Sequence, residues 1–179
     1  MDTEQLIQYA IEENFTDAKV LGTDELVFDD SFRPYCEENL CGQYGVNYSC
    51  PPVCGTPEEM RAKILSHKKA LLLQSTWEIS DYTDKEAIKK AKSAHNAAAL
   101  RLTKKVREEA GDAFMIGASG CALCNPCALA NNEPCRFPEL QYSCMSAYCI
   151  FVRKVTEKCN MEYDCGAGLL TFFGMILFD

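Results

Sequence analysis

Histidine and basic charge are both scarce in this sequence of 179 residues. The two histidines, His67 and His95, have Lys or Asn neighbours on predicted helices, and we expect both side chains to face solvent. No Ser/His/Asp or Cys/His arrangement is visible, and the glycines of GQYGVNYS lack the lysine of a phosphate-binding loop. The net charge of −8 argues against a nucleic-acid partner and against anionic membrane surfaces, since both require concentrated basic charge.

Long apolar runs are also missing. The longest, GLLTFFGMILF near the end of the sequence, is far shorter than the roughly 20 residues that span a bilayer, and it is typical of a buried strand. The opening MDTEQLIQYA is acidic and polar, unlike a secretory signal. We therefore expect a cytoplasmic protein with no membrane role, in a compartment that keeps thiols reduced.

Helix and strand signals alternate along the sequence. Thr56, Pro57 and Glu59 form the start of one predicted helix, and a longer one begins at the Thr83–Glu86 capping box and stops at Gly111. Further helices are expected at 3–15 and 143–159. Strands are expected at 18–30, as one interrupted strand or a hairpin, and at 69–79, 113–119 and 169–178. This alternation predicts an α/β fold: one compact domain over 1–179, with a mixed sheet of about four to five strands and packed helices.

Cysteine, by contrast, is abundant, with twelve residues. The stretch GCALCNPCALANNEPC has the spacing C-x2-C-x2-C-x7-C, and its first three thiols form the tight triplet that wraps a cluster in bacterial ferredoxins. Zinc sites usually join two separate C-x2-C pairs, and a reducing compartment disfavours disulfides. We therefore expect Cys121, Cys124 and Cys127 to hold a [4Fe-4S] cluster, with zinc as the alternative, and Cys135 as the nearest fourth ligand.

A second cysteine loop, YCEENLCGQYGVNYSCPPVCG, has the looser spacing C-x4-C-x8-C-x3-C. It makes Cys36, Cys41, Cys50 and Cys54 candidates for a second cluster, with its fourth ligand open between Cys54, Cys165 and an exchange with Cys135. Both loops interrupt the α/β pattern where such folds place ligands, and we expect them to lie side by side. Arg33 and Arg136 either offset the negative charge of a cluster or form surface salt bridges. The remaining Cys144, Cys149 and Cys159 are expected to be small buried apolar residues.

The two loops, with the following SCMSAYCI and the closing TFFGMILF, resemble the DUF2284 family of predicted metal-binding proteins, which come mostly from anaerobic bacteria and archaea. The resemblance implies a metal site and marks seven candidate ligands: Cys36, Cys41, Cys50, Cys121, Cys124, Cys127 and Cys135. Cys54 lies outside that pattern. The family usually has Ser-Met-Glu-Ala followed by a glycine, whereas this sequence has Ser146 for the acid and Cys149 for the glycine.

One or two clusters on an acidic surface, without a substrate motif, indicate electron transfer or a redox accessory role in anaerobic metabolism, with a protein redox partner. Two alternatives remain at this point: a zinc-stabilised structural or binding module, and an enzyme whose cluster has an open iron site. No catalytic residue can be assigned.

Overall fold

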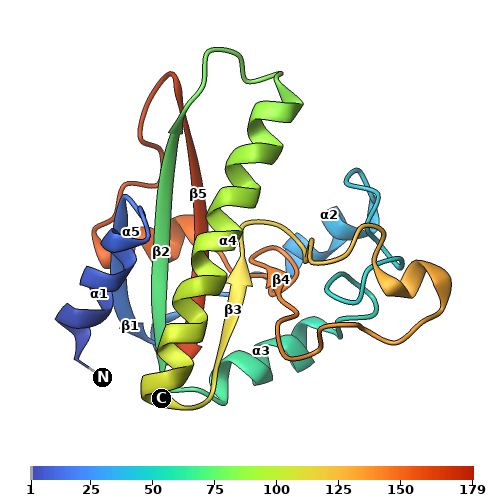
Figure 1. The fold of residues 1–179 in the computed structure, drawn as a ribbon, viewed down its shortest axis with the longest axis horizontal. Coiled ribbons are helices and arrows are strands. Elements are labelled where there is room, and N and C mark those ends of the chain that lie inside the picture. Colours follow the sequence, from blue (N-terminus) through green and yellow to red (C-terminus); the bar gives the residue numbers. More distant parts are fainter. Residues whose placement is uncertain (1) are drawn as a thin grey trace.

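The computed structural model describes residues 2–179, which form an α/β domain around a five-stranded sheet (Figure 1). The strand order is β1-β2-β5-β3-β4. Three neighbouring pairs are antiparallel, and only β3 and β4 are parallel, so the predicted mixed sheet is confirmed. The strands are β1 (Asp17–Gly22), β2 (Lys69–Glu78), β3 (Ala113–Gly117), β4 (Ser143–Cys144) and β5 (Leu169–Phe178).

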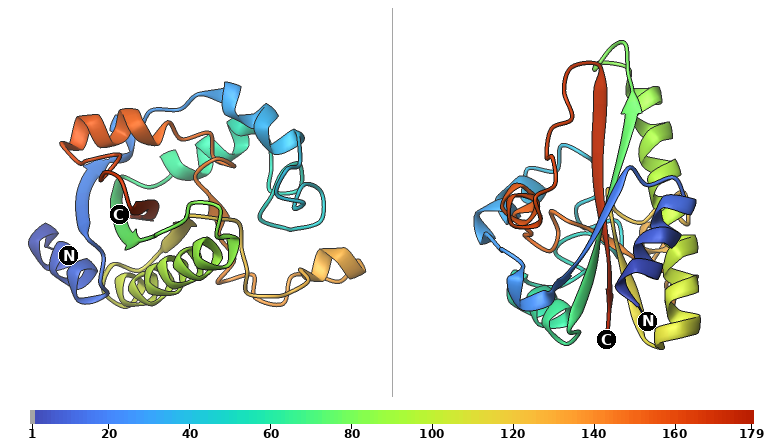
Figure 2. Two further views of the ribbon diagram at one scale, coloured as in Figure 1. Left: turned by 90° about the horizontal axis from the view of Figure 1, so that it is seen from above. Right: turned by 90° about the vertical axis from the view of Figure 1, so that its left-hand side faces the viewer.

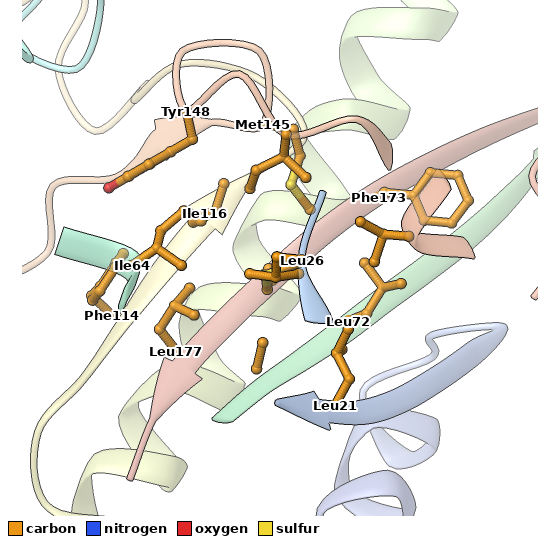
Figure 3. Close-up of a cluster of buried hydrophobic side chains, with 14 of the residues drawn as sticks. Leu21, Leu26, Ile64, Leu72, Phe114, Ile116, Met145, Tyr148, Phe173 and Leu177 are labelled. Carbon is orange, nitrogen blue, oxygen red and sulfur yellow. The ribbon is translucent and has the colours of Figure 1, made fainter. Parts of the chain in front are cut away.

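Helices cover both faces of the sheet (Figure 2). The long α4 (Lys85–Ala110) and α1 (Thr3–Glu12) pack on one face, whereas α3 (Pro57–Leu65) and α5 (Val152–Cys159) lie on the other. Side chains of β2 alternate accordingly. Leu71 and Leu73 join the core under α4, whereas Ala70 and Leu72 join the opposite core (Figure 3). The central strands are therefore buried on both faces, as their continuous apolar runs indicated.

Local signals fixed some helix ends correctly and missed others. Thr56 caps α3 by accepting from Glu59 N, Glu59 caps Thr56 N in return, and Gly111 ends α4 with a φ of 87°. However, α4 begins one residue later than expected. The side chain of Asp84, and not that of Thr83, accepts the capping hydrogen bond from Ala87 N.

Two predictions were wrong. The segment 143–159 is not one helix: Ser143 and Cys144 pair with β3, a turn follows, and only Val152–Cys159 is helical. The histidines do not face solvent either, since His67 is 7% exposed and His95 only 1%. His95 lies against Gly174 of β5, where an added Cβ would approach its Nε2 to 2.7 Å. The missing side chain lets α4 approach the sheet closely enough to cover this ring.

The two cysteine loops extend beyond the β4 edge of the sheet, where the short α2 (Arg33–Glu37) also lies (Figures 1 and 2). One loop runs from α2 to α3, and the other leaves the end of β3 and returns as β4. Between residues 2 and 179, no helix combines the length and apolar character needed to cross a membrane. The elements of the sheet thus deliver both loops to one end of the domain.

Candidate metal centre

The two cysteine loops are joined by hydrogen bonds around Cys121. Ser49 Oγ accepts from Cys121 N at 2.9 Å, and Asn47 Nδ2 donates to Cys121 O at 3.0 Å. Asn47 Oδ1 also accepts from Ser49 N and Oγ, at 3.0 and 2.9 Å. Both side chains are buried, so their polar atoms depend on these partners. The loops therefore form one unit, as expected.

Helix α4 fixes the chain just before Cys121. Asn96 is buried, its Oδ1 accepts from Ala118 N at 2.9 Å, and its Nδ2 donates to Ser119 Oγ at 2.9 Å. A Cβ on Gly120 would lie 3.0 Å from Cys50 Sγ. The position before Cys121 thus has to be small, because the second loop passes directly against a thiol of the first.

Four thiols of the second loop line one hollow. Its walls include the apolar side chains of Leu123, Ala128 and Phe137, and its four sulfur ligand candidates are half-buried: Cys121, Cys124, Cys127 and Cys135. Burial raises the pKa of Cys121, and the N–H groups of Leu123 and Tyr142, which donate to its sulfur, oppose that rise. The predicted triplet and its sequence-near fourth cysteine are therefore together.

The thiols of the first loop range from buried, at Cys50, to exposed, at Cys41. Burial raises the pKa of Cys50 to about 12 and that of Cys54 to about 11. Burial also raises the pKa of Cys36, with the Cys144 thiol the next contribution in the same direction. Cys41 is exposed. Without a metal, the buried thiols are therefore protonated at neutral pH, and a metal must displace their protons to bind.

Arg33 is buried beside these thiols at 8% exposure. Its Nη1 donates to Gly55 O at 2.7 Å and its Nη2 to Ala147 O at 2.8 Å, whereas its Nε has no partner within the described chain. Among residues 2–179, no carboxylate forms an ion pair with it. Instead it lowers the pKa of Cys54 and Cys36, against burial, which raises both. A buried cation without a carboxylate partner calls for a negative group among these sulfurs.

Comparison with known families decides what this arrangement belongs to. The model of the family described as "Predicted metal-binding protein (DUF2284)" matches residues 19–178, which include both loops and the sheet. The chain belongs to the DUF2284 family. No curated protein and no solved structure matches it. Membership makes this chain a predicted metal-binding protein, and a metal-binding role fits its twelve cysteines, all of them free thiols.

The remaining DUF2284 cysteines are placed differently. Cys159 packs against the sheet core near the α5 end, and its charged neighbours are Glu25 and Lys19 rather than thiols. Cys165 Sγ lies 3.7 Å from Gln74 Nε2 on β2, two strands from β3. These two therefore lie apart from the loops, and Cys165 is poorly placed to complete a cluster.

The cysteines of the two loops fit a metal group bound by several thiolates better than a single metal ion. Within residues 2–179, no three His, Cys, Asp or Glu side chains converge closely enough to hold a single ion. The four thiols of the second loop instead line one hollow. Arg136 forms a surface salt bridge with Glu133 at 2.8 Å, which was one of the two roles predicted for it. Arg33 forms no such pair within the described residues.

Sequence reasoning missed Asn47, Ser49 and Asn96, the polar side chains that hold the DUF2284 loops together. Their partners are 74, 72 and 22 residues away along the chain. Only the run of polar residues directly before Cys50 distinguishes the first two, and nothing marks Asn96 within its alanine-rich helix.

Proposed function

We propose that this DUF2284 protein binds one or two [4Fe-4S] clusters in its cysteine loops and transfers electrons to or from a protein partner. The observation that carries the proposal is Arg33, a buried guanidinium that donates to two backbone carbonyls, lowers the pKa of the Cys54 and Cys36 thiols and has no carboxylate partner in the described chain. Burial of an unpaired charge is unfavourable by several kcal/mol. A cluster with four thiolate ligands has a net negative charge that compensates for the guanidinium; zinc with four thiolates would do the same, so the choice of a cluster over zinc depends on ligand spacing.

The second loop supports a cluster on the grounds of ligand spacing. Cys121, Cys124 and Cys127 follow one another at intervals of three residues, and Cys135 completes the lining of the same hollow. A cubane takes one thiolate at each iron, so its ligands surround a body instead of meeting at a point. The four thiols around this hollow match that requirement, and its apolar walls restrict solvent, which tunes the cluster potential.

The contact between the loops supports electron transfer. Cys121 hydrogen-bonds to Ser49, and Gly120 lies against Cys50, so clusters in the two loops would be close neighbours. Large apolar side chains are exposed beside them, with Leu40 at 89% and Tyr35 at 67%. Such side chains suit a transient protein contact. A redox partner would approach at this end of the domain, and the free thiols suit a reducing, cytoplasmic location.

The chain's own residues would set the redox properties. The bound cluster supplies a reversible one-electron couple. N–H donors to Cys121 stabilise its thiolate, and the positive charge of Arg33 favours the reduced, more negative state of a neighbouring group. Ser49 and Asn47 hold the loops in one arrangement, which limits reorganisation when charge changes.

Redox titration of anaerobically purified protein tests this function. The proposal expects reversible reduction at roughly −400 mV, as in low-potential ferredoxins. Cys124→Ala should abolish one cluster, because the middle thiolate of the triplet has no substitute, while the matched Cys159→Ala should keep every cluster. A cluster that resists reduction and whose removal unfolds the protein would indicate a structural role instead. Full iron in Cys124→Ala would refute the assignment of the triplet.

A further inference from the structure

The first part of β5 has a strand on only one side. Residues 169–174 pair with β2, whereas β3 pairs with β5 only through residues 175–178. In Figures 1 and 2, β2 and β5 accordingly extend well beyond the end of β3. Within the described chain, no other strand lies beside residues 170–174. Every second residue of this segment therefore directs its N–H and C=O groups away from β2, toward an open edge.

A buried side chain of α4 fixes the chain where β3 ends. Asn96 Oδ1 accepts from Ala118 N at 2.9 Å, so this N–H group bonds to the helix instead of to β5. The chain then continues into the second cysteine loop. The position beside residues 170–174 that a longer β3 would fill is therefore not occupied by any strand of the described chain.

The open edge of β5, residues 170–174, lacks the charges and prolines that usually prevent exposed strands from pairing. Its sequence is LTFFG, and Leu170 and Phe172 are only half-buried. An apolar edge without such protection pairs readily with another extended chain. Beside it lies an open groove of about 170 Å³, whose mainly apolar lining contains no cysteine and includes Ala118, Met145, Tyr163 and Phe173.

Two cations flank the open edge, one on each face of the sheet. Lys92 Nζ on α4 lies 5.9 Å from the centre of the Phe172 ring. On the other face, the guanidinium of Arg153 on α5 lies 4.6 Å from the centre of the Tyr163 ring, which stacks on Phe173. Neither cation forms an ion pair within residues 2–179. In a protein with a net charge of −8, these two cations favour an acidic partner at this edge.

We propose that the open edge of β5 binds an extended, acidic segment of a partner protein, which joins the sheet as a strand in line with β3. The backbone of this segment pairs with residues 170–174. Its side chains alternate between the two faces of the sheet, with apolar groups in the groove and acidic groups beside Lys92 or Arg153. The inference goes beyond the proposed function and does not depend on which metal the loops bind.

A second copy of this chain fits the open edge less well. A symmetric antiparallel pair of β5 strands would bring the Lys92 side chains of both copies to one face of the joint sheet and both Arg153 side chains to the other. Like charges at such a seam are unfavourable. An acidic segment instead meets a cation on each face.

Hydrogen exchange followed by mass spectrometry tests the pairing in anaerobically purified protein. The probe is a synthetic peptide of alternating Val and Glu residues, and the matched control peptide has Lys in place of Glu. Saturation with the Val–Glu peptide should slow exchange of the outward amides within residues 170–174 by at least about tenfold. Docking through side chains alone would not protect these amides.

Charge reversal on the helices tests the choice of an acidic partner. Lys92→Glu and Arg153→Glu should each weaken binding of the Val–Glu peptide about fivefold and strengthen binding of the Val–Lys peptide. Lys104→Glu is the matched control, because Lys104 is exposed on α4 and the substitution changes the net charge equally. It should change the affinity by less than about twofold.

Unchanged exchange of residues 170–174 with either peptide would overturn the proposal, and so would equal affinity for both peptides. Slow exchange of this segment without peptide, in a protein that sediments as a dimer, would show that a second copy occupies the edge and would overturn the acidic partner. A protein that takes up no iron but binds the Val–Glu peptide in this way would refute the proposed function and support this inference.

Discussion

Removal of the Ser49 hydroxyl should separate the two cysteine loops. The Ser49→Ala change takes away the acceptor of Cys121 N, at 2.9 Å, and the donor to Asn47 Oδ1, also at 2.9 Å. Ser49 is 0% exposed, so water cannot readily replace it. An unsatisfied buried N–H costs about 1–3 kcal/mol, and a lost neutral hydrogen bond about 0.5–1.5 kcal/mol. We expect a total loss of about 2–4 kcal/mol in the free energy of unfolding.

Thermal unfolding followed by circular dichroism measures this loss. For a domain of this size, each kcal/mol shifts Tm by about 2–4 °C, so Ser49→Ala should lower Tm by roughly 5–15 °C. Ser66→Ala is the matched control, because the Ser66 hydroxyl donates to Lys63 O on an exposed helix end. The control should change stability by less than about 0.5 kcal/mol. Equal, small effects of both substitutions would show that Ser49 does not join the loops.

Three further changes probe other parts of the account. Burial lowers the pKa of His95 from 6.5 to about 4, so between these values the unfolded chain binds a proton that the folded chain does not. The free energy of unfolding should therefore fall by about 2 kcal/mol between pH 7 and pH 5. Urea unfolding at the two pH values should show a smaller fall in His95→Gln than in the wild type. Gly120→Ala brings a Cβ to 3.0 Å from Cys50 Sγ, so it should lower the free energy of unfolding by about 1–3 kcal/mol and reduce the iron content. A variant with the stability and iron content of the wild type would contradict the close contact. Arg33→Met should destabilise cluster-loaded protein more than metal-free protein, because only the former loses a charge partner; equal effects in calorimetry would argue against the pairing.

Much of the fold follows from local sequence signals. The capping box at Thr56 and the stop at Gly111 depend on residues within a turn of each helix end, so the sequence indicates them directly. The helix predicted over 143–159 was wrong because the conformation of this segment depends on contacts with distant residues. Cys144 pairs with Gly117, and Cys149 takes a left-handed φ of 54°, which no residue inside an α-helix has. Pairing with β3 therefore determines the conformation of this segment, whereas its apolar residues alone favour a helix.

The candidate centre was predictable in part. Spacing alone grouped the thiols of each loop, because three ligands in a tight turn are a local feature. Burial of Arg33 depends on contacts between distant segments, such as the bond from Arg33 Nη2 to Ala147 O. His95 illustrates the same limit: its burial requires Gly174 on a strand that comes much later in the sequence. Residue type does not reveal such pairs without the fold.

The metal content of anaerobically purified wild-type protein tests the central claim most directly. Iron and acid-labile sulfide should be present in equal amounts, at about four to eight of each per chain, in a brown protein with broad visible absorption. A colourless protein that contains one or two zinc ions and takes up no iron on anaerobic reconstitution would contradict the account.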